Sequence, residues 1–186
     1  LAEIGEFVQS IPLLKYLCNE IPEDETVRML LAEQLVNYAY DLYGEGYLMK
    51  SSSVTVEAIS SVKTVICELE CMTQNVWIIL SKAIYLFSLV ESKIDDLPIE
   101  NLVEIFQSTE MRNTTDLDSI DNISMEEILS QENVDNITIT AEFLILSSKY
   151  AISTPDYEQQ TATVKCACWH NIGIAELVAF VTLKDK

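Results

Sequence analysis

Glycine and histidine are scarce in this chain, which has four glycines and one histidine among its 186 residues. A turn that cradles nucleotide phosphates needs several glycines close together, so the shortage of glycine argues strongly against one. His170 is the lone histidine, and spacing alone supports neither a Ser-His-Asp nor a Cys-His catalytic site. We therefore expect a protein that is not an enzyme and carries no cofactor.

Basic residues are also few. The chain has 11 Lys and Arg against 30 Asp and Glu, for a net charge of −19, and the cations are scattered singly from Lys15 to Lys186. Binding to a phosphate backbone requires several cations on one surface, so we expect no direct nucleic-acid binding by this segment. The same charge disfavours adsorption to an anionic membrane.

A hydrophobic run long enough to span a membrane is missing as well. Residues 76–90 are apolar on nearly every face, but a span needs about 20 apolar residues, and Lys82 lies near the middle of this run. The pattern favours a central helix covered on both sides over membrane insertion.

The five cysteines form an odd set without the spacing of a disulfide framework, which favours a reducing compartment. Three Asn-x-Ser/Thr sequons, at Asn113, Asn122 and Asn136, are of a kind that a stretch rich in Asn, Ser and Thr produces by chance. No signal peptide is visible, so we predict a cytoplasmic protein. The chain begins at Leu1 with an apolar helix already under way, and we expect a fragment of a larger protein.

The residues from Glu23 to Leu42 form the clearest predicted helix. Acidic residues stand at its start, where unpaired N–H groups favour negative charge, and Gly44 and Gly46 follow its end. Its apolar stripe recurs at three- and four-residue steps. The predicted stripe consists of Val27, Leu30, Leu31, Gln34, Leu35, Tyr38 and Leu42.

This helix and the one before it resemble a HEAT or armadillo-like repeat, in which a proline and leucines precede the turn and an Asp and a Val-Arg pair follow it. The residues that carry the resemblance are Pro12, Asp24, Val27, Arg28, Leu31, Ala32 and Leu35. We expect the apolar members to fill the space between helices, Asp24 to cap the turn, and Arg28 to reach back to an adjacent acidic group. Any amphipathic helical hairpin is the alternative, because short repeat signatures are degenerate.

Further periodic segments extend the pattern along the chain. The predicted helices span residues 2–19 (with a kink at Pro12), 23–43, 53–71, 76–90, 98–107, a segment from about 140, and 154–183. They pair into spans 2–44, 53–92 and 138–184, each near the roughly 40 to 47 residues of a HEAT unit. We therefore predict an all-α fold of antiparallel helical pairs stacked as a HEAT-like α-solenoid.

An acidic stretch divides this array. From Gln107 to Asp135 carboxylates, Ser, Thr and Asn dominate and large apolar residues are few, which indicates a mobile insertion. We therefore divide the chain into helical pairs at 1–107, the acidic insertion at 108–137 and a C-terminal helical pair at 138–186.

Cysteine and histidine also offer a metal-binding alternative. Cys67 and Cys71 lie four residues apart, and Cys166, Cys168 and His170 cluster further along. Zinc could use four of them, but structural zinc ligands usually come from tight knuckles rather than from within a helix. We predict no metal site and keep a Cys/His metal-binding domain as an alternative.

Residues 161–178 resemble a segment of the thyroid adenoma-associated protein family, large HEAT proteins in which a Cys-Trp pair follows an acidic insertion. Cys168 and Trp169 match the pair, whereas His170 stands where that family is expected to have Arg. The resemblance implies a non-catalytic scaffold that partners a tRNA 2′-O-ribose methyltransferase.

These observations together predict a helical-repeat scaffold or adaptor for protein–protein interaction, with a role in tRNA methylation if the resemblance holds. A compact helical bundle that binds a partner helix is the alternative from the same residues.

Overall fold

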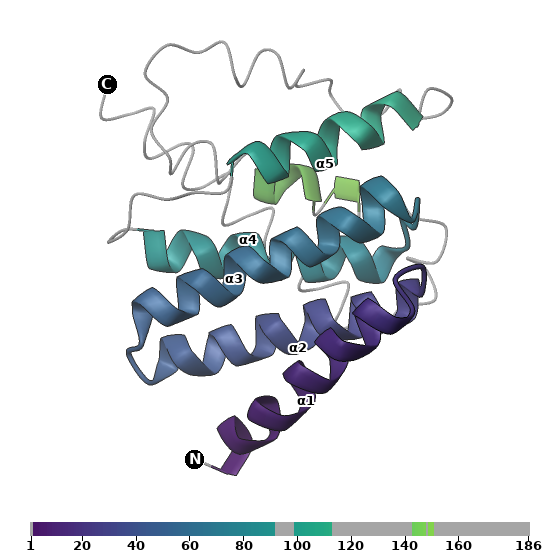
Figure 1. The fold of residues 1–186 in the computed structure, drawn as a ribbon. Coiled ribbons are helices and arrows are strands. Elements are labelled where there is room, and N and C mark those ends of the chain that lie inside the picture. The colour runs from purple at the N-terminus through teal and green to yellow at the C-terminus, as the bar shows by residue number, and fades with distance from the viewer. Residues whose placement is uncertain (1, 92–98, 113–142, 148, 151–186) are drawn as a thin grey trace, which may run out of the picture.

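A computed structural model describes residues 2–91, 99–112, 143–147 and 149–150. In these ranges the chain is helical and has no β-strand (Figure 1). The elements are α1 (Ala2–Glu20), α2 (Glu25–Gly44), α3 (Leu48–Lys63), the π-helical turn η1 (Thr64–Glu68), α4 (Gln74–Glu91) and α5 (Ile99–Arg112). Residues 143–147 and 149–150 are helical too.

Successive helices run in alternating directions and stack side by side, as Figure 1 shows. Helix α2 packs between α1 and α3, α4 packs against α3 and α2, and α5 packs against α3 and η1. This arrangement confirms the predicted all-α fold of stacked antiparallel helical pairs.

The ends of α2 are set by local chemistry. The Asp24 side chain accepts a hydrogen bond from the Val27 N–H at 3.0 Å and so satisfies one of the unpaired donors of the first turn. At the other end Gly46 adopts a φ of 83°, the left-handed conformation that only glycine adopts without strain. The N–H groups of Gly46 and Tyr47 donate to the carbonyls of Tyr43 and Leu42 at 3.0 and 2.8 Å, which is the Schellman pattern.

The connection predicted at residues 44–53 is shorter than expected, because α3 already begins at Leu48. Ser51 and Ser52, in the predicted connection, lie within the helix and are buried, whereas Ser53 is exposed. Ser51 Oγ donates to the Ala39 carbonyl on α2 at 2.7 Å, and Thr55 Oγ1 donates to the Ser51 carbonyl at 2.8 Å. These bonds satisfy hydroxyl groups that would otherwise be costly to bury.

Helix α2 is buried on a wider arc than the predicted stripe. Leu31, Leu35, Tyr38 and Leu42 are buried as expected, but Leu30 is 45% exposed. The arc also includes Ala32, Val36 and Ala39, which the stripe left out. Helices pack on both sides of α2, so the buried surface covers more than one narrow face.

Helix α4 is covered on several sides, as the apolar composition of residues 76–90 predicted. Lys82 is exposed, while apolar side chains around most of the circumference are buried. The buried residues are Val76, Trp77, Ile79, Leu80, Ala83, Ile84, Leu86, Phe87 and Val90. Among the described helices, none combines the length and the apolar character needed to cross a membrane.

An aromatic cluster closes the core between α4, α5 and residues 143–150. Trp77 stacks on Tyr150 with ring centroids 4.6 Å apart, and Phe106 stacks on Phe143 at 5.3 Å. Trp77 and Phe106 join the two pairs at 6.0 Å. The described residues that follow the acidic stretch, 143–147 and 149–150, therefore belong to the same hydrophobic core as α4 and α5.

The three-part domain division stays a prediction. Helix α5 runs to Arg112, so residues 108–112, assigned to the acidic insertion, are helical. The remainder of the insertion and the predicted helix at residues 154–183 lie outside the described residues.

Candidate protein-interaction surface

The repeat-signature residues lie together at the junction of α1 and α2. Leu31, Ala32 and Leu35 are buried with exposed fractions of 6%, 0% and 1%, and Val27 packs against the same core. Pro12 lies within α1 on its exposed side. The apolar members of the signature thus pack α2 against its neighbours. Ala32 is fully buried, and its small side chain suits a close approach of the helices.

Arg28 differs from its expected role. Its Nε donates to the Pro22 backbone carbonyl at 2.9 Å, where an acidic side chain had been expected. Burial raises the pKa of the nearby Cys18 thiol, the Arg28 charge opposes that rise, and the Asp24 charge adds to it.

The two described cysteines of the metal-site alternative do not form a binding cluster. Cys67 lies in η1, and its Sγ donates to the Glu104 carbonyl on α5 at 3.8 Å. Burial raises the pKa of the Cys71 thiol, which disfavours the thiolate that a metal needs. No group of three or more His, Cys, Asp or Glu side chains that could hold a metal occurs in the ranges the structure covers. Cys166, Cys168, Trp169 and His170 lie outside those ranges.

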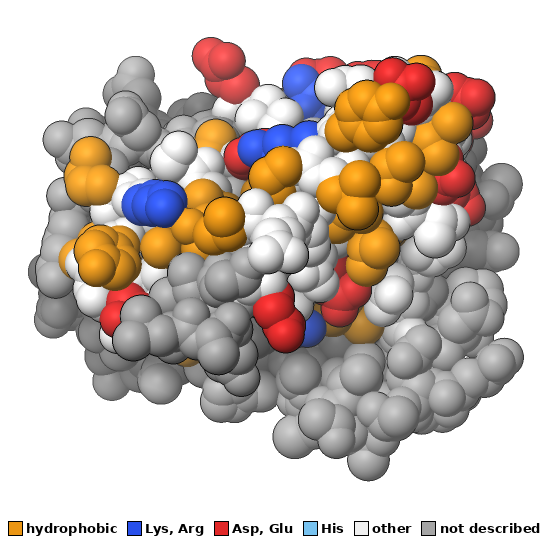
Figure 2. All heavy atoms as spheres, turned by 60° about the horizontal axis from the view of Figure 1, so that its bottom comes forward, with side chains coloured by type: hydrophobic (Ala, Val, Ile, Leu, Met, Phe, Trp, Pro, Cys, Tyr) orange, Lys and Arg blue, Asp and Glu red, His pale blue; other side chains and the backbone are white. Residues whose placement is uncertain are grey.

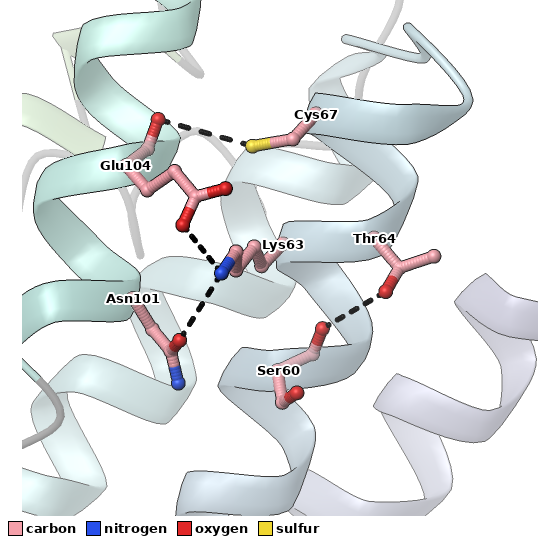
Figure 3. A network of polar contacts seen from close by, with 6 residues as sticks. All are labelled: Ser60, Lys63, Thr64, Cys67, Asn101 and Glu104. Atoms are coloured by element: carbon pink, nitrogen blue, oxygen red, sulfur yellow. Dashed lines mark hydrogen bonds and ion pairs between the residues drawn. The ribbon is translucent and has the colours of Figure 1, made fainter.

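A polar network ties the end of α3 to α5 (Figure 3). Lys63 forms an ion pair with Glu104 and donates to Asn101 Oδ1 at 3.5 Å. The hydrogen bond from Lys63 to Glu104 raises the pKa of the lysine. Ion pairs that are partly exposed, as this one is, contribute little stability, so the network adds little to the packing of α5.

The outer side of the α1–α2 hairpin carries an unusual set of exposed apolar side chains. We call this set the α1 surface. It consists of Val8, Leu13, Tyr16, Ile21 and Leu30, which are exposed by 61%, 58%, 57%, 38% and 45%. Figure 2 looks onto this side of the molecule and shows hydrophobic side chains gathered there with carboxylates beside them.

Negative charge surrounds the α1 surface. Glu6, Glu20, Glu23 and Glu25 are all exposed. Residues 1–49 contain seven Glu and two Asp but only two cations, Lys15 and Arg28. Lys15 pairs with Glu57 on α3, and Arg28 bonds to the Pro22 carbonyl. Only the Lys15 charge is paired with a carboxylate, but acidic residues outnumber basic ones in this part of the chain, so its net charge is negative.

A second and smaller exposed apolar site lies at the corner between α2 and α3. Tyr47 and Met49 are exposed by 60% and 72%. Lys50 lies beside them with its Nζ 5.3 Å from the centre of the Tyr38 ring, at cation–π distance. This corner therefore combines exposed apolar side chains with the Lys50 charge and the exposed Glu45.

Sequence reasoning missed the α1 surface. It placed Leu30 on the buried stripe of the helix at 23–43 and singled out no exposed apolar residue in the helix at 2–19. The available signal was that residues 7–17 are apolar around most of the helix circumference. One face of such a helix packs inward, and the other is exposed in the described residues.

Stacked antiparallel helices with an exposed apolar outer surface define a segment of an all-α helical-repeat array. No family model matches the chain. Among curated proteins it is similar to Superkiller protein 3 of Saccharomyces cerevisiae, with 40% identity over 185 residues. The match covers 100% of this chain but only 13% of the yeast protein, so the chain spans a small part of that relative's length.

This similarity corrects the family suggested by Cys168 and Trp169. The match to Superkiller protein 3 extends over the whole chain, whereas the resemblance to the thyroid adenoma-associated family rested on about twenty residues. The resemblance was wrong, and the tRNA methylation role and the tRNA methyltransferase partner that depended on it are wrong as well. A short Cys-Trp pair on an amphipathic helix is too common to identify a family.

Proposed function

We propose that this chain is a non-catalytic segment of a helical-repeat scaffold whose work is to bind other proteins. The observation that carries the proposal is the exposed apolar surface on a stack of antiparallel helices. Monomeric proteins rarely expose contiguous apolar side chains without a binding role. Helical-repeat arrays present extended surfaces of this kind to their partners.

The yeast relative supports the same proposal. This chain is 40% identical over 185 residues to a segment of Superkiller protein 3, and the match covers the whole of this chain. We propose that it performs in its own protein the structural role that the matching segment performs in the yeast protein. Its partners are then proteins, in the cytoplasm, and its charge of −19 argues against direct contact with nucleic acid.

A segment exchange tests this proposal. The matching segment of yeast Superkiller protein 3 is replaced by this chain, and the proteins that co-purify with the chimera are compared with those of the native yeast protein. We expect the chimera to retain them. The control is a chimera in which the segment carries Phe106→Asp, which disrupts the aromatic core and so removes the folded scaffold.

The proposal fails if the chimera is expressed and folded at native levels yet co-purifies with none of the proteins that accompany the native yeast protein. Circular dichroism and thermal unfolding of the isolated chain establish that it is helical and folded before the exchange is interpreted.

A further inference from the structure

We draw no further inference here: the strongest candidate, the exposed apolar patch of Tyr47 and Met49 at the corner between α2 and α3, carries none because nothing in the structure shows what covers it.

Discussion

The Trp77 and Tyr150 rings stack with centroids 4.6 Å apart and an interplanar angle of 19°. These residues are 73 positions apart, and the acidic stretch of the chain lies between them. Their contact joins α4 to Tyr150, and Phe106 on α5 stacks on both rings, so all three belong to one core. In the cluster that they form with Phe106 and Phe143, truncating a buried ring is therefore expected to destabilise the fold.

Phe106→Ala is expected to lower the free energy of unfolding by about 3–5 kcal/mol, because the ring is 1% exposed and stacks on three other aromatic rings. Urea unfolding followed by circular dichroism measures the change. The matched control is Tyr16→Ala, which removes an exposed ring and should alter stability by about 0.5 kcal/mol or less. Similar losses in the two variants would show that the aromatic cluster is not the core.

Asp24→Ala is expected to cost about 1 kcal/mol, since the Val27 N–H loses its acceptor at the first turn of α2. Asp24→Asn retains a side-chain oxygen and should recover most of the loss. Glu23→Ala, one residue earlier and exposed, controls for the removal of a charge. The same urea titration measures all three variants, and an Asn variant as unstable as the Ala variant would contradict the capping role.

The two glycines at the end of α2 are expected to respond in opposite directions. Gly46→Ala places a Cβ on a residue with φ of 83° and should destabilise the chain by about 1 kcal/mol. Gly44→Ala adds a Cβ to a helical residue with no atom within 4 Å and should stabilise by up to about 1 kcal/mol. Thermal unfolding of both variants checks the pair, and a loss of stability with Gly44→Ala would contradict the helix end described here.

Tyr40 should make stability fall at alkaline pH. Burial raises the pKa of Tyr40 to about 12, and the neighbouring Tyr85 adds to the rise. Because the folded state holds this proton more tightly than the unfolded state, the contribution is fully present below pH 10 and is lost as pH rises toward 12. The loss is about 2 kcal/mol or less after allowance for the exposed part of the ring.

Tyr40→Phe provides the measurement, since it removes the titrating group but keeps the ring. Chemical unfolding at pH 9 and pH 11 should show a smaller decrease for the variant than for the original chain. Ultraviolet titration of the folded protein should at the same time lose one tyrosine that ionises late. An unchanged titration curve would contradict the burial of the Tyr40 hydroxyl.

Much of the helical layout followed from the sequence. The acidic start of α2, the glycines at its end and the continuous apolar run of α4 are local features, and local features determine where a helix begins and ends. The start of α3 was predicted at residue 53 rather than Leu48. Ser51 is favourable inside the helix because its hydroxyl donates to the Ala39 carbonyl on α2, a contact that the local sequence does not reveal.

The repeat motif could not identify the repeat family. Val27, Leu31 and Leu35 fit any helix packed between two others, so they predict stacked helices without distinguishing one repeat type from another. The similarity to Superkiller protein 3 corrected the family assignment, because that comparison uses every position of the chain rather than a short motif.

The sequence by itself determined that the described ranges are helical and that the chain is strongly acidic, since propensity, periodicity and charge are properties of residues and their neighbours along the chain. Only the tertiary structure decided which apolar residues are buried. Ile11 and Val8 are equally hydrophobic in a local pattern, but Ile11 faces the stack and Val8 faces outward, because burial depends on where α2 and α3 lie in space.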